Sequence, residues 1–90
     1  MLRLLFTESY TRRARRFLKR HPELKRQYAK TLELLQLNPR HHSLRLHRLK
    51  GKLGDLHSVS INLTYRITID FIIHEDTIIL VDVGSHDEVY

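Results

Sequence analysis

The chain of 90 residues is long enough for one domain with one modest hydrophobic core, since 41% of its residues are apolar. It contains no cysteine, which excludes disulfides, a catalytic thiol and thiolate metal sites. We recognise neither a secretory leader nor an apolar run approaching the ~18 residues of a membrane span. We therefore expect a soluble, cytoplasmic protein.

The net charge of +6 is divided unevenly along the chain. Residues 1–53 hold 15 Lys and Arg against 3 Asp and Glu, a net charge of +12. Residues 54–90 hold one arginine, Arg66, against 7 Asp and Glu, a net charge of −6. The basic part favours a polyanionic partner, either a nucleic acid or an acidic protein, although basic helix faces also occur in domains without one.

The first half predicts a strand followed by a helical hairpin. Leu2–Phe6 is a short apolar strand, and Thr7 can cap a helix through its hydroxyl. The helix runs to Arg20, and a second, from Pro22, ends before Asn38 because proline restricts the residue that precedes it. Apolar residues recur at helical spacing in both, at Tyr10, Ala14, Phe17, Leu18, Leu24, Tyr28, Leu32 and Leu35.

Residues 40–53 read as a basic connector passing over a binding face. Its leucines, Leu44, Leu46 and Leu49, are spaced so that they can hold it on the core. The cations between them, together with His47, are expected to face outward: Arg45, Arg48, Lys50 and Lys52.

From Leu56 onward the apolar residues recur at every second position, which is typical of strands. The alternation predicts strands over 56–61 and 63–73, and the apolar run 77–83 predicts an interior strand that ends at Gly84. The fold class is therefore α+β, with the helical hairpin on one face of a mainly antiparallel sheet. We expect the other face to be open and to carry Ser58, Ser60, Arg66 and Thr68.

Arg66 is the strongest candidate for a functional residue. It lies on the polar side of the predicted middle strand, a rigid position from which a guanidinium can face a phosphate. A structural ion pair with Asp70 or Asp82 is the alternative.

The end of the chain offers further titratable groups. His86 can exchange a proton near neutral pH, and Tyr90 can donate a hydrogen bond or stack on a base. Asp87 and Glu88 are candidate paired carboxylates, although neighbours in sequence are weak evidence for a shared cleft.

Other histidines are ambiguous. His47 could reach the same face from the connector, whereas strand alternation places His57 on the side of Val59, which favours a structural role. His41 and His42 are adjacent and lack metal-ligand spacing, so we expect no metal and no cofactor.

The element order and several short motifs resemble the RelE/ParE superfamily of type II toxin-antitoxin toxins over essentially the whole chain, closest to the RelE and YafQ branches. The motifs are Leu49-Lys50-Gly51 before the sheet, Tyr65-Arg66-Ile67 on the middle strand, and the ending Gly84-Ser85-His86-Asp87-Glu88-Val89-Tyr90. The resemblance implies a single RelE-like domain over residues 1–90.

The resemblance implies ribosome-dependent, metal-independent cleavage of mRNA. Arg66 matches the arginine that stabilises the phosphate, and His86 falls where the YafQ branch has an acid-base histidine. Tyr90 matches a terminal aromatic residue that orients the RNA, and His47 a loop histidine. Lys50, Lys52, Arg48 and Arg45 are candidates for binding the RNA backbone on their own chemistry. Asp87 and Glu88 then become spacers.

One departure concerns Ser58 and Ser60, which stand where RelE has lysines. The alternatives are a ParE-like inhibitor of DNA gyrase and a non-catalytic basic module that binds RNA or protein. In a toxin, the implied partners are the ribosome, mRNA and a cognate antitoxin with an acidic disordered segment. DNA would be contacted only through the antitoxin, and no membrane partner is implied.

Overall fold

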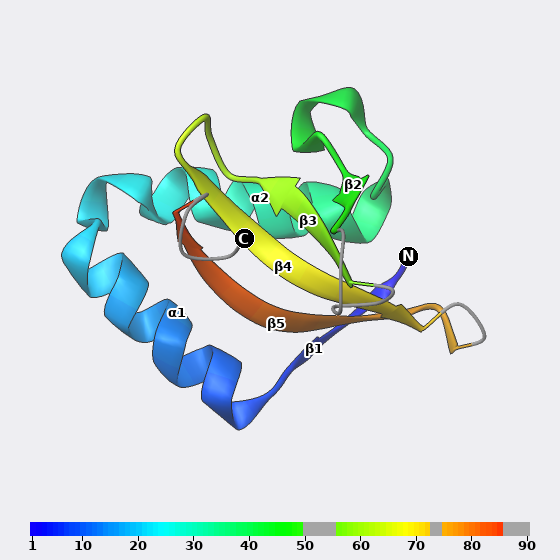
Figure 1. Cartoon of the computed structure of the whole chain (residues 1–90), viewed down its shortest axis with the longest axis horizontal. Helices are drawn as coiled ribbons and strands as arrows, with labels where there is room; N and C mark the ends of the chain where they lie inside the picture. Colours follow the sequence, from blue (N-terminus) through cyan, green and yellow to red (C-terminus); the bar gives the residue numbers. More distant parts are fainter. Residues whose placement is uncertain (50–55, 73–74, 86–90) are drawn as a thin grey trace.

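A computed structural model of the chain describes residues 1–49, 56–72 and 75–85. One mixed sheet has the strand order β1-β5-β4-β3-β2, in which β1 is parallel to β5 and the other neighbours are antiparallel (Figure 1). The elements are β1 Arg3–Phe6, α1 Glu8–Arg20, the 3-10 turn η1 Pro22–Leu24, α2 Lys25–Leu37, the 3-10 turn η2 His42–Leu44, β2 His47–Arg48, β3 Leu56–Ser60, β4 Tyr65–Ile72 and β5 Thr77–Ser85.

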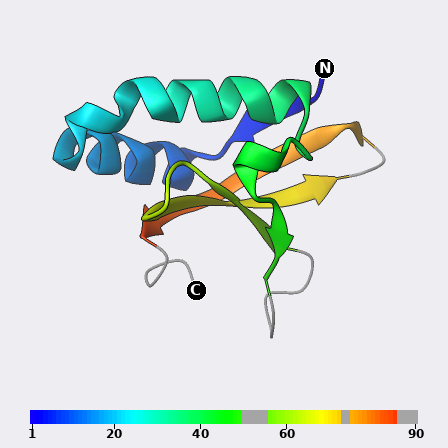
Figure 2. The ribbon, with the colours of Figure 1, turned by 90° about the horizontal axis from the view of Figure 1, so that it is seen from above.

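Both helices lie on one face of the sheet (Figure 2), which confirms the predicted α+β architecture. Thr7 caps the start of helix α1, and its hydroxyl oxygen accepts a 3.2 Å hydrogen bond from the Tyr10 amide. The helix ends at Arg20, and His21 caps it before Pro22, as predicted. Phe17 of α1 meets Tyr65 of β4 edge-on, with ring centroids 5.1 Å apart, and so anchors the start of the central strand.

A buried pair of tyrosine hydroxyls joins the two helices. The hydroxyl oxygens of Tyr10 and Tyr28 are 2.6 Å apart, and Tyr10 is completely buried. Burial, reinforced by the neighbouring Tyr28, raises the pKa of Tyr10 well above its ordinary value. Burial also raises the pKa of Tyr28. Around this pair the core is formed by apolar residues of both layers, among them Phe17, Leu35, Val59, Ile67, Ile69, Ile78 and Leu80.

The connector is more regular than predicted. Its described part contains η2 and β2, and β2 pairs antiparallel with β3 to extend the sheet. Leu44 and Leu49 are buried and Leu46 is partly buried against the core, as their spacing predicted. The buried leucines hold the connector against the sheet, where its backbone N–H and C=O groups need hydrogen-bond partners. Pairing of β2 with β3 provides such partners.

Two predicted strand boundaries are wrong. Residues 61–64 form a turn, in which the Asn62 side-chain oxygen accepts bonds of 2.9 and 2.8 Å from the amides of Thr64 and Tyr65, and Leu63 is 84% exposed. At the other end, β5 continues through Gly84 to Ser85 because both residues still pair with β4.

The prediction of an open second sheet face is also wrong. Ser58, Ser60, Arg66 and Thr68 are all buried, with Arg66 only 8% exposed. The long Arg66 side chain lies against β3, and the connector approaches it from the β2 side. Among the described residues, Thr68 Oγ1 is a buried polar atom without a hydrogen-bond partner.

Candidate active site around Arg66

The guanidinium of Arg66 is held by hydrogen bonds from two directions. Nε donates to Ser58 Oγ at 2.8 Å, and Nη2 donates to the Arg45 carbonyl at 2.9 Å. A longer contact of 3.4 Å joins Nη2 to the Ser58 carbonyl. An arginine with so many fixed contacts has one orientation, so its positive charge occupies a defined place on the sheet.

The sheet register explains how Arg66 reaches these partners. On β4 it lies opposite Ser60 of β3 and opposite Gly84 of β5. Ser60 Oγ donates at 2.6 Å to the Asn62 carbonyl in the adjoining turn, whereas Ser58, two residue pairs further along, accepts from Arg66.

His47 lies beside Arg66. Its Nδ1 is 3.2 Å from Arg66 Nη2 and 3.3 Å from the Arg45 carbonyl. A guanidinium only donates and a carbonyl only accepts, so the tautomer of His47 decides which of the two contacts is a hydrogen bond; Nδ1 accepts from Arg66 when it carries no proton. His47 as a whole is an exposed residue.

The backbone of Arg45 is part of this arrangement. Arg45 has φ 47° and ψ 49°, a left-handed conformation that is uncommon for residues other than glycine. Its carbonyl accepts from Arg66, while its exposed side chain remains available for other contacts. Such backbone geometry is frequently found at functional sites.

The structure thus brings together Arg66, His47 and the backbone of Arg45, while Arg48 lies on β2 opposite His57. The other candidates, Lys50, Lys52, His86 and Tyr90, lie outside the described residues, as do Asp87 and Glu88. Strand β5 ends at Ser85, which pairs with Tyr65 next to Arg66. The participation of Lys50, Lys52, His86 and Tyr90 in the site stays a prediction.

Sequence reasoning missed the role of Ser58. The resemblance implies that Ser58 replaces a lysine of a cationic site, whereas the structure makes its hydroxyl and carbonyl acceptors for Arg66. Alternation places Ser58 and Arg66 on the same face, which was the available signal. Their proximity also depends on the strand register, which the pattern does not give.

Acidic partners for Arg66 were the alternative prediction. The described ion pair of Asp82 is with Arg13 of α1, at 3.7 Å, and Asp82 Oδ1 also accepts from the Val83 amide.

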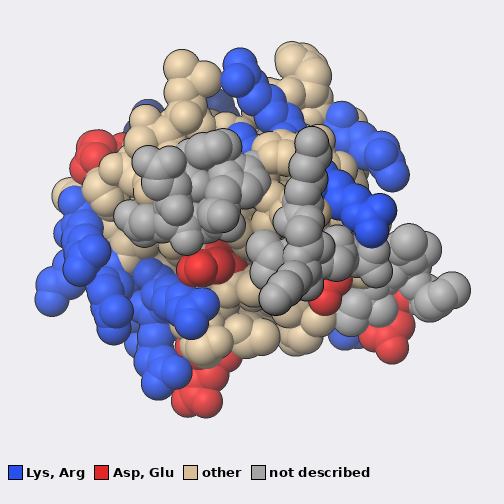
Figure 3. Space-filling model, viewed as in Figure 1, with Lys and Arg blue, Asp and Glu red and all other residues tan. Residues whose placement is uncertain are grey.

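Lysines and arginines gather on two sides of the sheet face that points away from the helices: over α1, and around η2 and β2 (Figure 3). A negatively charged ligand on this face would be attracted from both sides.

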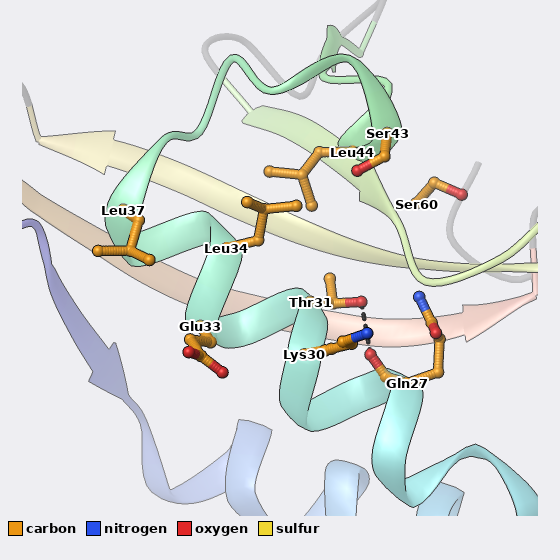
Figure 4. A pocket seen from close by; sticks show the side chains of 9 residues that line it. All are labelled: Gln27, Lys30, Thr31, Glu33, Leu34, Leu37, Ser43, Leu44 and Ser60. Atoms are coloured by element: carbon orange, nitrogen blue, oxygen red, sulfur yellow. Dashed lines mark hydrogen bonds between the residues drawn. The ribbon is translucent and has the colours of Figure 1, made fainter.

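A cavity of about 380 Å³ lies between α2 and η2 (Figure 4). Its lining includes Leu34, Leu37 and Leu44, and the Thr31 hydroxyl at its wall donates to the Gln27 carbonyl at 2.8 Å. Neither Arg66 nor His47 lines it, so the candidate chemistry lies elsewhere.

Within residues 1–49, 56–72 and 75–85 there is no group of three or more His, Asp or Glu side chains arranged to hold a metal ion. In the same ranges no helix is long and apolar enough to cross a membrane.

No family model and no curated protein matches the chain. Several solved structures are similar to it. A metal-bound toxin from Helicobacter pylori is 24% identical with a TM-score of 0.80, and the match covers 100% of both chains. YafQ from E. coli is 11% identical with a TM-score of 0.80, covering 100% of this chain and 99% of that one.

The toxin of the YoeB-YefM complex from Staphylococcus aureus provides a third match. It is 16% identical with a TM-score of 0.73, covering 96% of this chain and 98% of that one. These likenesses extend over nearly the whole length of each protein. The chain therefore has the fold of the YafQ and YoeB toxins, in agreement with the resemblance in its sequence.

Proposed function

We propose that this protein is the toxin of a type II toxin-antitoxin system of the RelE/ParE superfamily, a ribosome-dependent mRNA endoribonuclease acting in the cytoplasm. The observation that carries the proposal is the fixed Arg66 guanidinium with His47 at 3.2 Å, on a fold shared with YafQ and YoeB. A fixed cation beside a group able to transfer a proton suits phosphodiester cleavage.

In the proposed reaction the RNA supplies its own nucleophile. The 2′-hydroxyl loses its proton to a base and attacks the adjacent phosphorus. The bond from phosphorus to the 5′-oxygen breaks as that oxygen receives a proton from an acid. The products are a 2′,3′-cyclic phosphate and a 5′-hydroxyl, and no metal is required for the balance of atoms or charge.

Each step of this reaction is assigned to particular residues. Arg66 stabilises the charge that develops on the phosphate, and fixed charge of this kind needs no reorganisation during the reaction. His86 is assigned the acid-base step and Tyr90 the orientation of the RNA, both from the resemblance. His47, whose Nδ1 is 3.2 Å from Arg66 Nη2, is a second candidate for proton transfer. Lys50, Lys52, Arg48 and Arg45 bind the RNA backbone.

The proposed regulator is an antitoxin with an acidic disordered segment. The YoeB structure is a complex with YefM, described for a related crystal as a toxin-antitoxin heterotetramer. In this chain α1 carries several exposed arginines, among them Arg12, Arg15 and Arg16, which suit capture of an acidic segment.

The test is cleavage in a translation extract with mapping of mRNA ends. Wild type should cut message within ribosome-bound codons, and Arg66→Gln should reduce the cleavage rate by a factor on the order of 10² to 10³. Arg12→Gln removes the same charge from the exposed surface of α1 and serves as the matched control. Intact message during complete translation arrest would overturn the proposal.

A ParE-like inhibitor of DNA gyrase is the second candidate. It is favoured by the burial of Arg66, whose Nε and Nη2 donate within the protein, and by Ser58 in place of a lysine. Inhibition needs no proton transfer, so it should survive substitution of His86 and His47. A supercoiling assay with purified gyrase separates this candidate from the nuclease and from a non-catalytic binding module.

A further inference from the structure

A second cavity, of about 250 Å³, lies between the C-terminal half of α1 and the sheet. Its wall includes Tyr65 of β4, which packs against Phe17 of α1 and therefore lies on the helix-covered face. Arg66, the next residue of the strand, faces the opposite side of the sheet, so this cavity is separate from the candidate active site. The lining consists of Arg13, Arg16, Phe17, Arg20, His21, Tyr65, Asp82 and Val83.

The lining carries an excess of positive charge. Arg13, Arg16 and Arg20 are exposed and lie three and four positions apart, which places them on one side of α1. The carboxylate among the lining residues is Asp82, which pairs with Arg13 at 3.7 Å. Three arginines and one carboxylate give a net charge of +2 when His21 is neutral. The cavity therefore attracts anions, and a dianion matches its charge.

Arg16 and Arg20 supply this excess, because Asp82 already balances the charge of Arg13. Within the described ranges of the chain, neither Arg16 nor Arg20 forms a hydrogen bond or an ion pair with another side chain. The two residues lie four positions apart on the helix, a spacing at which like charges repel each other. A ligand whose negative oxygens bridge the two guanidinium groups removes this repulsion and provides acceptors for both.

Aromatic rings fix the wall opposite these arginines. The ring of His21 packs against those of Phe17 and Tyr65, with centroids 4.9 and 4.7 Å away. The His21 amide also donates to the Phe17 carbonyl at 2.9 Å, which holds the ring at the end of α1. The cavity thus keeps its shape without a ligand, and binding has to order only the exposed arginine side chains.

We propose that this cavity binds the phosphate group of a small phosphate monoester through Arg16 and Arg20. Such a group carries a charge of about −1.5 to −2 at pH 7, which matches the lining, and its three terminal oxygens accept paired N–H groups of arginine. A phosphodiester has a single negative charge and two free oxygens, so it matches less well. The cavity is smaller than the roughly 300–1,000 Å³ usual for drug-sized ligands, which suits a phosphate head group.

The binding test uses ribose 5-phosphate and dimethyl phosphate with the purified full chain, followed by calorimetry and by NMR of the His21 ring and the arginine Nε–H groups. We expect the monoester to bind at least tenfold more tightly than the diester and to shift the signals of His21, Arg16 and Arg20. Equal affinity for the two probes would assign the surface to nucleic-acid backbone and overturn the proposal. This binding does not depend on the proposed nuclease activity.

A pair of double variants separates a site from general attraction to a basic surface. Arg16→Gln with Arg20→Gln should weaken binding of ribose 5-phosphate at least tenfold. Arg26→Gln with Lys30→Gln removes two exposed charges at the same spacing from α2 and should leave the affinity within twofold of wild type. Equal losses in the two double variants would overturn the site.

Asp82→Asn should strengthen binding. It raises the net charge of the lining to three arginines without a carboxylate and releases Arg13, while the asparagine oxygen can still accept from the Val83 amide. We expect a gain of several-fold in affinity for ribose 5-phosphate, with thermal unfolding as the check on folding. An unchanged or weaker affinity in the folded variant would contradict a site whose affinity depends on the charge of this lining.

Discussion

Arg66 donates from Nε to the hydroxyl oxygen of Ser58 at 2.8 Å, so a serine on β3 fixes the orientation of the arginine on β4. Both residues are buried, Ser58 completely. The position of the proposed catalytic charge therefore depends on a neutral neighbour.

Substitution Ser58→Ala should lower both stability and activity. It leaves a charged donor buried without this acceptor, which costs about 1–3 kcal/mol in the free energy of unfolding. The cleavage rate should fall because Arg66 gains alternative orientations. Urea unfolding and cleavage assays measure the two effects.

Ser60→Ala is the matched control for this prediction. It removes a buried hydroxyl that donates to the Asn62 carbonyl and should affect stability more than cleavage. Equal losses of cleavage in the two variants, after correction for the folded fraction, would contradict a specific role for Ser58.

Two substitutions of His47 separate positioning from proton transfer. The amide oxygen of His47→Asn can replace Nδ1 as an acceptor for Arg66, whereas His47→Gln places its amide near the position of Nε2. If His47 transfers a proton, both variants should lose at least tenfold in kcat and the pH profile of cleavage should lose one limb.

If His47 only positions Arg66, the asparagine variant should keep most of its activity and the wild-type pH profile. Steady-state kinetics from pH 5 to 9 provide the measurement. The same series on His86→Gln tests the acid-base role that the resemblance assigns to that residue.

The Tyr10–Tyr28 pair should give a non-additive mutant cycle. Tyr10→Phe or Tyr28→Phe alone leaves one buried hydroxyl without its partner and should destabilise the protein by about 1–3 kcal/mol. The double variant should lose less than the sum, because both polar groups are then absent. Denaturant unfolding of the four proteins measures the coupling, and strict additivity would contradict a shared hydrogen bond.

The same pair predicts a decline in stability at alkaline pH. Burial raises the pKa of Tyr10 in the folded protein, whereas in the unfolded chain it titrates near its ordinary value of 10.0. The stability contribution is complete below about pH 10 and falls above it, because the unfolded state then releases a proton that the folded state keeps. Thermal unfolding between pH 8 and 11 should show a shallower decline for Tyr10→Phe than for wild type.

Capture of the antitoxin should depend on the charge of α1. Replacing Arg12, Arg15 and Arg16 with glutamine should slow association with the cognate antitoxin and reduce its dependence on salt, because steering by charge acts mainly on the association rate. Stopped-flow or surface-based kinetics at several ionic strengths test this.

An equal number of substitutions at exposed cations of α2, such as Lys25, Arg26 and Lys30, provides the comparison. Association rates that are insensitive to both sets of substitutions and to salt would contradict electrostatic capture.

The periodicity of apolar residues, together with the residues that begin and end helices, predicts much of the architecture. The threonine cap, the two prolines and the apolar stripes predicted the helical hairpin, because these signals act within a few residues along the chain. The boundaries at Leu63 and Gly84 were wrong, since the Asn62 turn and pairing of β5 with β4 outweighed the apolar pattern. The short strand β2 was missed because two residues carry no detectable periodicity.

The sequence by itself determined the fold class, the division of charge and the choice of Arg66 as a candidate, all of which follow from residue types and their spacing. Tertiary structure decided that the face around Arg66 is buried, that Ser58 holds its guanidinium and that His47 lies beside it. These contacts join residues 8 to 21 positions apart in the chain, and they depend on strand register and on the left-handed turn at Arg45. A pattern along one strand does not specify which residue of the next strand it will meet.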